Sequence, residues 1–188
     1  MVDSPTPQQP TGGNSSEKPF ALRSVVYTAG FLLFILGLVP SVFYLIEQAC
    51  CGTGFNWKTI GNFWSAFQGL VGHGVFAIGL ATYLFCSAWL IFHGRGPHVE
   101  FDPPKHFVAT GPYRWVRNPV VITLLICVLG EAIALGSWGI LILLLAGMPI
   151  AHAQVTKLEE PLLRERFGQS YIDYCNTVNR WLPKPPRN

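Results

Sequence analysis

Two short polar segments carry the side chains that are best suited to chemistry in this chain. The first is Gly-Pro-Tyr-Arg-Trp-Val-Arg-Asn-Pro at residues 111–119, which comes directly before an apolar run. The second is the adjacent pair Glu159 and Glu160, which follows the next apolar run. Arginine and asparagine can bind a carboxylate, and carboxylates can bind ammonium groups and hydroxyls. Because charged groups are costly near lipid, both segments indicate a binding site.

Each of these residues also has a structural interpretation. Arg114 and Arg117 lie three residues apart and share a helix face, from which they could reach lipid phosphates. Asn118 and Pro119 fit a helix N-cap followed by proline at the first helical position. Adjacent glutamates could simply end a helix in solvent. Taken singly, the segments leave both interpretations open.

The composition predicts the elements that must position these groups. Half of the 188 residues are apolar and 12% are charged, and the mean hydropathy of +0.35 is typical of a membrane protein. In lipid every backbone polar group must be satisfied internally, so apolar stretches of this length predict helices. Four stretches qualify: residues 22–46, 69–92, 120–135 and 138–153.

The expected fold is therefore an all-α integral membrane protein with about four transmembrane helices and short cytoplasmic C-terminal helices. Residues 1–20 are rich in Pro, Ser, Gln, Gly and Asn, which predicts a disordered tail. Residues 21–188 form one transmembrane domain. Gly136 and Ser137 predict a tight turn between the last two spans, and Pro149 is expected to break the fourth.

Positive charges predict the orientation of the chain in the bilayer. They gather in the N-terminal flank, in the loop before residue 120 and in the C-terminal tail. An even number of spans then places both termini and this loop in the cytoplasm, so both polar segments can build one site. No basic stripe with interleaved aromatics is present, so nucleic acid is not an expected partner.

Other residues carry weaker signals. Gly94 and Gly96 allow a ligand to approach the backbone, or they end a helix. Cys50 and Cys51 are adjacent, which suits neither an unstrained disulfide nor zinc, and no metal site is expected. Glu131 lies within a span, where an acid is a functional candidate unless it sits at the far interface.

Three motifs, in this order and spacing, resemble the isoprenylcysteine carboxyl methyltransferase family, which is related to the phospholipid methyltransferases: Gly111-Pro112-Tyr113-Arg114-x-x-Arg117-Asn118-Pro119, Glu159-Glu160, and Phe167-Gly168-x-x-Tyr171-x-x-Tyr174-x-x-x-Val178-x-Arg180-Trp181-x-Pro183. The resemblance covers residues 92–183. It implies a membrane-embedded enzyme that uses S-adenosylmethionine and acts on a lipophilic acceptor. The run at residues 101–104 resembles bacterial members, which implies a bacterial inner membrane.

The resemblance also implies roles for individual residues. Those expected to bind the cofactor are Gly94, Gly96, Gly111, Pro112, Tyr113, Asn118, Pro119, Glu159 and Glu160. Arg114 or Arg117 would orient a carboxylate acceptor, whereas Glu160 would be the base for an amine. The chain departs from the family where Asn118 replaces a common histidine and where residues 120–121 are Val-Val instead of Met-Tyr.

Three alternatives stay open at this point. The acceptor could be a prenylcysteine-like carboxylate, a phospholipid amine or another hydrophobic small molecule. The chain could be a non-catalytic membrane scaffold of the same family. It could also be a small four-helix transporter in which Glu131 binds protons or cations, although that function leaves the loop motifs unexplained. The sequence does not give the oligomeric state.

Overall fold

The computed structural model describes residues 17–52, 61–94 and 106–185. These ranges are mostly helical and contain no strand. The first helix begins at Glu17, so residues 17–20 are helical although the composition predicted a disordered tail through residue 20. The rest of that predicted tail lies outside the described residues, as does Gly96.

The helices form long rods, several of which continue through a wider π-helical turn. Their bounds in chain order are α1 (Glu17–Leu32), η1 (Leu33–Leu38), α2 (Val39–Cys50), α3 (Asn62–Gly94), η3 (Gly111–Arg114), α4 (Pro119–Leu135), α5 (Trp138–Gln154), η4 (Val155–Glu159), α6 (Glu160–Phe167) and α7 (Gln169–Thr177). The two short C-terminal helices α6 and α7 agree with the predicted pattern.

Three rods are long and apolar enough to cross a membrane: Ser24–Cys50, Asn62–Gly94 and Trp138–Phe167. The helix α4 is also apolar, but its 17 residues make it shorter, and at 1.5 Å per residue it spans roughly 26 Å. The all-helical membrane fold is thus confirmed. The expected number of four spans is approximate, because α4 is somewhat shorter than the bilayer core of roughly 30 Å.

The expected break at Pro149 is wrong. Residues 138–154 form one α-helix with this proline inside it, and the rod continues to Phe167. A proline removes a single backbone donor, and membrane helices tolerate such a loss because neighbouring groups compensate for it. The C-terminal end of this helical rod, up to Phe167, therefore continues directly from its membrane-spanning part.

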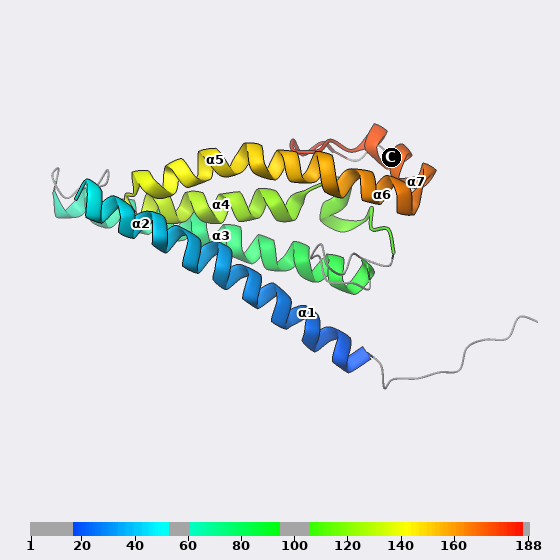
Figure 1. The fold of residues 1–188 in the computed structure, drawn as a ribbon, viewed down its shortest axis with the longest axis horizontal. Coiled ribbons are helices and arrows are strands. Elements are labelled where there is room, and N and C mark those ends of the chain that lie inside the picture. Colours follow the sequence, from blue (N-terminus) through cyan, green and yellow to red (C-terminus); the bar gives the residue numbers. More distant parts are fainter. Residues whose placement is uncertain (1–16, 53–60, 95–105, 186–188) are drawn as a thin grey trace, which may run out of the picture.

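The bundle is tightest between α3 and α4, which run side by side (Figure 1). Small residues bring their backbones together, since a Cβ on Gly72 would lie 2.2 Å from the Ala134 nitrogen and one on Gly130 would lie 2.5 Å from the Phe76 nitrogen. Close approach at small residues is typical of membrane helix pairs. This contact fixes α4, whose first residue follows the polar loop. In contrast, α1 diverges from the bundle.

The turn between α4 and α5 is short, as predicted. Gly136 has a left-handed conformation with φ 61°, and the Ser137 hydroxyl caps α5 by accepting from the Ile140 amide. Glu47 of α2 reinforces this cap. Its carboxylate accepts hydrogen bonds from the Ser137 hydroxyl and from the amides of Trp138 and Gly139, the last two at 3.1 Å.

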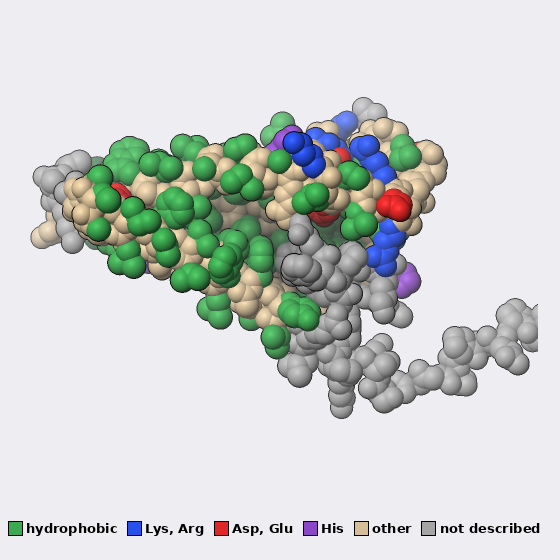
Figure 2. All heavy atoms as spheres, in the orientation of Figure 1, with side chains coloured by type: hydrophobic (Ala, Val, Ile, Leu, Met, Phe, Trp, Pro, Cys, Tyr) green, Lys and Arg blue, Asp and Glu red, His purple; other side chains and the backbone are tan. Residues whose placement is uncertain are grey.

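Charge is distributed unevenly over the surface. Figure 2 shows hydrophobic side chains along the length of the bundle, whereas the visible Lys and Arg side chains gather at the end formed by α6, α7 and the C-terminal segment. The polar loop and Glu159–Glu160 lie at this same end, so the fold brings the two sequence segments together.

Candidate functional site

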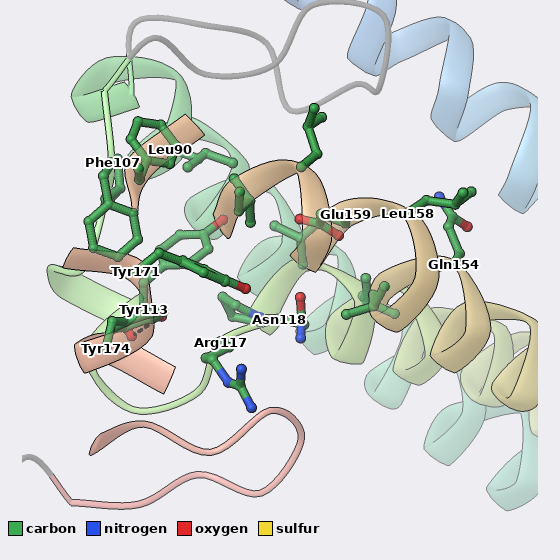
Figure 3. Close-up of a pocket in the computed structure, with 18 of the residues that line it drawn as sticks. Leu90, Phe107, Tyr113, Arg117, Asn118, Gln154, Leu158, Glu159, Tyr171 and Tyr174 are labelled. Atoms are coloured by element: carbon green, nitrogen blue, oxygen red, sulfur yellow. Dashed lines mark hydrogen bonds between the residues drawn. The ribbon is translucent and has the colours of Figure 1, made fainter. Parts of the chain in front are cut away.

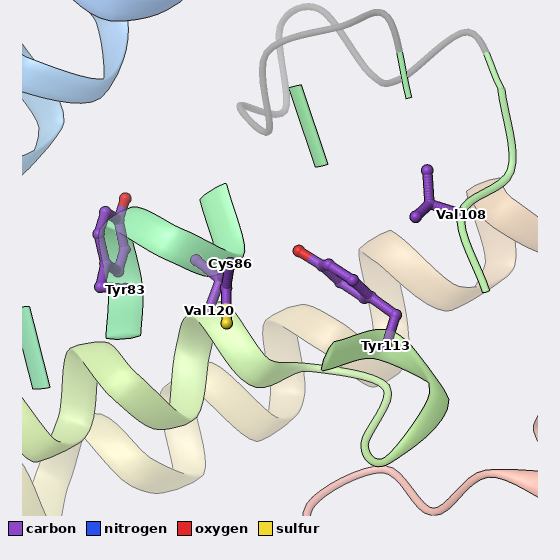
Figure 4. Packing of buried hydrophobic residues seen from close by; sticks show 5 residues of the cluster. All are labelled: Tyr83, Cys86, Val108, Tyr113 and Val120. Atoms are coloured by element: carbon purple, nitrogen blue, oxygen red, sulfur yellow. The ribbon is translucent and has the colours of Figure 1, made fainter. Parts of the chain in front are cut away.

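A buried tyrosine anchors the polar loop. Tyr113, on the 3-10 helix Gly111–Arg114, packs into a core cluster with Tyr83, Cys86, Val108 and Val120 (Figure 4). The cluster joins the loop to α3 and to the first turn of α4. The position of the loop relative to both helices is therefore set by packing as well as by backbone hydrogen bonds.

Gly111 is a position where only glycine fits, and it lies in the described part of the loop. Its φ of 59° is in the left-handed region, and a Cβ would lie 2.3 Å from Trp89 Cε2. The Trp89 indole also donates to the Thr110 hydroxyl at 3.3 Å. Gly111 thus lets the loop turn directly beneath the indole and carry Tyr113 into the core.

A cavity of about 510 Å³ lies beside this loop, at the end of the long helical stretch Trp138–Phe167, here called the C-terminal rod (Figure 3). Its volume is within the range of small-molecule sites. Its polar wall comes from the loop, the end of α5 and η4: Tyr113, Arg117, Asn118, Gln154 and Glu159. Apolar side chains from the membrane helices line the remainder: Phe31, Leu90, Val121, Leu124, Ala151 and Leu158.

Two residues that line the cavity each carry a buried polar atom without a hydrogen-bond partner among the described residues. These atoms are the Tyr113 hydroxyl and Arg117 Nε. Burial raises the pKa of Tyr113 well above its usual value of 10, so its hydroxyl stays neutral and keeps a proton to donate. Because buried polar groups are nearly always paired, these two unpaired donors indicate a site for a polar ligand.

Aromatic rings form a second wall. Phe107 lies 5.5 Å from Phe167, 5.8 Å from Tyr171 and 5.1 Å from Tyr174, measured between ring centroids, and all four residues line the cavity. The Tyr174 hydroxyl donates to the Tyr113 carbonyl at 2.7 Å, which ties α7 to the loop. Aromatic rings attract cations, so this wall suits a ligand with a positive centre.

Glu160 lies behind the cavity in a cluster of arginines. It is 3% exposed, and Arg180 binds it with two hydrogen bonds, Nε to Oε1 at 2.6 Å and Nη2 to Oε2 at 2.9 Å. Arg117 Nη1 donates to Oε1 at 3.1 Å, and Arg164 lies 3.6 Å from Oε2. The hydrogen bond to Glu160 raises the pKa of Arg180, consistent with a strong bidentate pair.

The structure places five of the eleven predicted site residues around one cavity. Four predicted residues of the loop and α4 line it, together with one of the two glutamates: Tyr113, Arg117, Asn118, Pro119 and Glu159. Gly111 and Pro112 belong to the 3-10 helix and shape the loop without lining this cavity. Gly94 ends α3, and its carbonyl accepts from the His106 amide at 3.0 Å.

Two predicted catalytic residues have surroundings that do not fit the expected roles. Arg114 is exposed and does not line the cavity, so it is not placed to orient an acceptor there. Glu160 has both oxygens engaged by arginines and does not line the cavity, so it is poorly placed to act as a base. Adjacent helical residues point about 100° apart, which is why Glu159 reaches the cavity and Glu160 does not.

Sequence reasoning assigned no site role to several residues that the structure brings here. Tyr171, Tyr174 and Arg180 belong to the third motif, and their position in that motif was the available signal. Phe107 belongs to none of the three motifs, so the sequence did not indicate a role for it. In the part of the chain that is described, no group of three or more His, Cys, Asp or Glu residues could hold a metal ion.

Comparison with known protein families identifies the chain. Residues 67–170, more than half of the sequence, match the family described as phospholipid methyltransferase. Neither the curated proteins nor the solved structures gave a match. The matched region contains most of α3, the polar loop, α4, α5 and both glutamates, and it supplies most of the residues that line the cavity. This multi-pass, helical chain therefore belongs to the phospholipid methyltransferase family, a family of membrane methyltransferases.

Proposed function

We propose that the chain uses S-adenosylmethionine to methylate an amine on a lipophilic acceptor. One observation carries this proposal: the cavity has a polar wall at the loop and an apolar wall that continues into the membrane helices. A cofactor with charged ends suits the first wall. An acceptor that dissolves in the bilayer suits the second.

The residues at the polar wall fit this cofactor. The buried Tyr113 hydroxyl and Arg117 Nε are unpaired donors, which suit the carboxylate or hydroxyls of the cofactor. Asn118 is 8% exposed as a residue, and its side-chain amide can donate and accept. The Glu159 carboxylate suits an ammonium group or ribose hydroxyls. The aromatic wall formed by Phe107 and its neighbours suits a sulfonium cation.

The charges at the cavity favour an amine over a carboxylate acceptor. Arg114 is exposed outside the cavity, and Arg117 Nη1 already donates to Glu160 and to the Cys175 sulfur. The lining instead offers the carboxylate of Glu159 and an aromatic wall. A carboxylate acceptor would meet like charge there, whereas an amine or its methylated ammonium product would be stabilised.

The chain itself would position the reactants and take up a proton. When bound, S-adenosylmethionine would supply a methyl group whose bond to sulfur breaks as the acceptor nitrogen bonds to it. Glu159 would accept the proton that the methylated nitrogen releases. The apolar wall would exclude water, and the rigid loop would hold the nitrogen in line with the methyl group.

The proposed orientation follows from the positive residues near the site. Arg117, Arg164 and Arg180 gather around Glu160, and Arg114 lies in the same loop as Arg117. By the positive-inside rule the part of the bundle that holds these arginines faces the cytoplasm, in what we propose is a bacterial inner membrane. The cofactor would then enter from the cytosol and the acceptor from the bilayer.

Binding of S-adenosylhomocysteine to protein in detergent tests the cofactor. The wild type should bind it, and Asn118→Ala and Glu159→Gln should bind roughly tenfold more weakly, since each loses about 1.4 kcal/mol of polar contact. Glu165→Gln is the matched control, because Glu165 is exposed on α6 and does not line the cavity. Absence of binding by the wild type would overturn the proposal.

Transfer of a labelled methyl group to total lipid extract tests the acceptor. A labelled amine lipid supports the proposal. A labelled ester, recognised by release of methanol in base, would overturn the choice of an amine. Binding without any transfer would instead indicate the non-catalytic scaffold.

A further inference from the structure

A segment outside the matched family region contacts the site at several points. Residues 178–184, here called the strap, follow α7 and are not helical. The family match ends at residue 170. Nevertheless the strap runs along the polar loop and reaches back to α5 and α6, as the contacts below show.

Two backbone hydrogen bonds join the strap to the loop. The Arg117 amide donates to the Asn179 carbonyl at 2.9 Å, and the Lys184 amide donates to the Trp115 carbonyl at 2.8 Å. A third bond comes from the Asn118 side chain, which donates to the Arg180 carbonyl at 3.3 Å. The strap therefore holds both of the loop residues that line the cavity next to α4.

Two side chains join the strap to the long C-terminal rod. Arg180 binds both oxygens of Glu160 on α6, and the Trp181 indole donates to His152 Nδ1 on α5 at 3.0 Å. Glu160 is buried, so its charge needs this compensation. Arg180 is consequently one link between the rod and the loop, beside Arg117, which also donates to Glu160.

The shared carboxylate couples the strap to Arg117. Arg117 reaches Glu160 through Nη1 alone, at 3.1 Å, while Arg180 occupies both oxygens at shorter distances. Without Arg180, Glu160 would draw the Arg117 guanidinium into a closer pair. Arg117 lines the cavity, so such a movement would change the wall that faces the ligand.

We infer that the strap is a positioning element, in which Arg180 neutralises Glu160 and thereby holds Arg117 and Asn118 in the orientation that binds ligand. Arg180 itself does not line the cavity. Its effect on binding passes through Glu160 and the loop. This inference rests on the proposed cofactor site, but its contacts exist whatever the ligand is.

Two measurements on full-length protein test the inference. The first is hydrogen exchange of the peptide that covers residues 113–119, without ligand, in wild type, Arg180→Ala, Arg180→Lys and the control Lys157→Ala, an exposed cation on the same rod. Arg180→Ala should speed exchange in this peptide and leave α3 and α4 unchanged. Arg180→Lys should give an intermediate rate, because lysine keeps the charge but cannot form two parallel bonds.

The second measurement is the affinity for S-adenosylhomocysteine. Arg180→Ala should weaken it roughly tenfold in the wild type but only about twofold in a Glu160→Gln background, because the two residues act as one unit. Equal losses in both backgrounds, or unchanged exchange at residues 113–119, would overturn the inference. If Arg180→Ala does not fold, Arg180→Lys supplies the same comparison. Faster exchange in a protein that binds no S-adenosylhomocysteine would support the strap and overturn the proposed cofactor.

Discussion

Two buried glutamates stand at opposite ends of the bundle and are neutralised in different ways. Glu47 accepts hydrogen bonds from one hydroxyl and two backbone amides at the start of α5. Glu160 is bound by guanidinium groups from the loop, from its own helix and from the strap. Both carboxylates connect segments that are far apart in the sequence, yet only Glu160 lies beside the cavity.

The groups that neutralise the two carboxylates differ in what they can affect. The contacts of Glu47 stabilise the fold, whereas those of Glu160 can also change the position of residues in the binding site. Backbone amides at a helix N-terminus are fixed by the helix and complement a negative charge. Arginine side chains are long and can exchange partners around a carboxylate. Substitutions at Glu47 should therefore change stability alone, whereas those at Glu160 should change stability and ligand binding together.

The largest effect is expected for Glu160→Ala. Removing the carboxylate leaves Arg117 and Arg180 without their shared partner, which should lower the free energy of unfolding by about 3 kcal/mol. Affinity for S-adenosylhomocysteine should fall more than tenfold, beyond the roughly 1.4 kcal/mol of a single polar contact. Thermal unfolding and ligand titration in detergent measure both quantities. If Glu160→Ala folds and binds S-adenosylhomocysteine with wild-type affinity, then Glu160 affects stability alone, as Glu47 does, and the prediction is wrong.

A smaller effect, on stability alone, is expected for Glu47→Ala. The amides of Trp138 and Gly139 would lose their acceptor, which should cost about 2 kcal/mol of unfolding free energy. Affinity for S-adenosylhomocysteine should stay within about twofold of the wild type, as for a distant site. The same two assays apply. A large loss of affinity would mean that the two ends are coupled through α5.

Tyr174→Phe should have a smaller effect that is confined to the site. It removes the hydroxyl that donates to the Tyr113 carbonyl at 2.7 Å but keeps the ring in the aromatic wall. Stability should fall by about 1 kcal/mol. Hydrogen exchange should become faster around residue 113 and should change little near Ser137. Tyr44→Phe, on α2 at the other end, is the matched control; equal exchange in both variants would contradict the prediction.

The smallest overall effect is expected for Glu131→Gln. Glu131 lies in α4 and does not line the cavity, so affinity for S-adenosylhomocysteine should stay within about twofold of the wild type, as is usual for remote substitutions. Reconstituted vesicles provide the second measurement. Proton-coupled flux that is present in the wild type and lost in this variant would favour the transporter alternative.

The sequence predicted the helices better than it predicted the contacts between them. Apolar runs placed the helices near their observed positions, and the Gly136–Ser137 turn was recognised because glycine and a helix cap leave a local signature. The break at Pro149 was wrong because a rule for helices in water was applied to one in lipid. Local patterns carry no information on distant partners, so the links from Glu47 to α5 and from Glu160 to Arg180 could not be predicted.

The sequence predicted the candidate site only in outline, because local patterns do not show how distant segments meet. Tyr113, Arg117, Asn118 and Glu159 lie together because their motifs stand at the ends of adjacent spans. Glu159 lines the cavity and Glu160 binds the arginines behind it because of how one helix is rotated. Residue types alone do not reveal this rotation. The aromatic wall needs Phe107 and α7 to meet, and that contact depends on the whole fold.

The π-helical turn at Val155–Glu159 makes the number of residues as important as their identity. A π turn holds one residue more than an α turn over the same rise, and such turns are frequent at functional sites. Deleting Lys157 would convert this π turn into an ordinary α turn over the same rise, so α6 would keep its orientation relative to α5 and Glu160 would stay among its arginines. Inserting one residue with α winding would instead turn α6 by about 100° and move Glu160 away, although every charged side chain of the cluster is still encoded. Among homologous chains, a single-residue insertion in this turn would therefore disconnect the rod from the loop more completely than a single-residue gap.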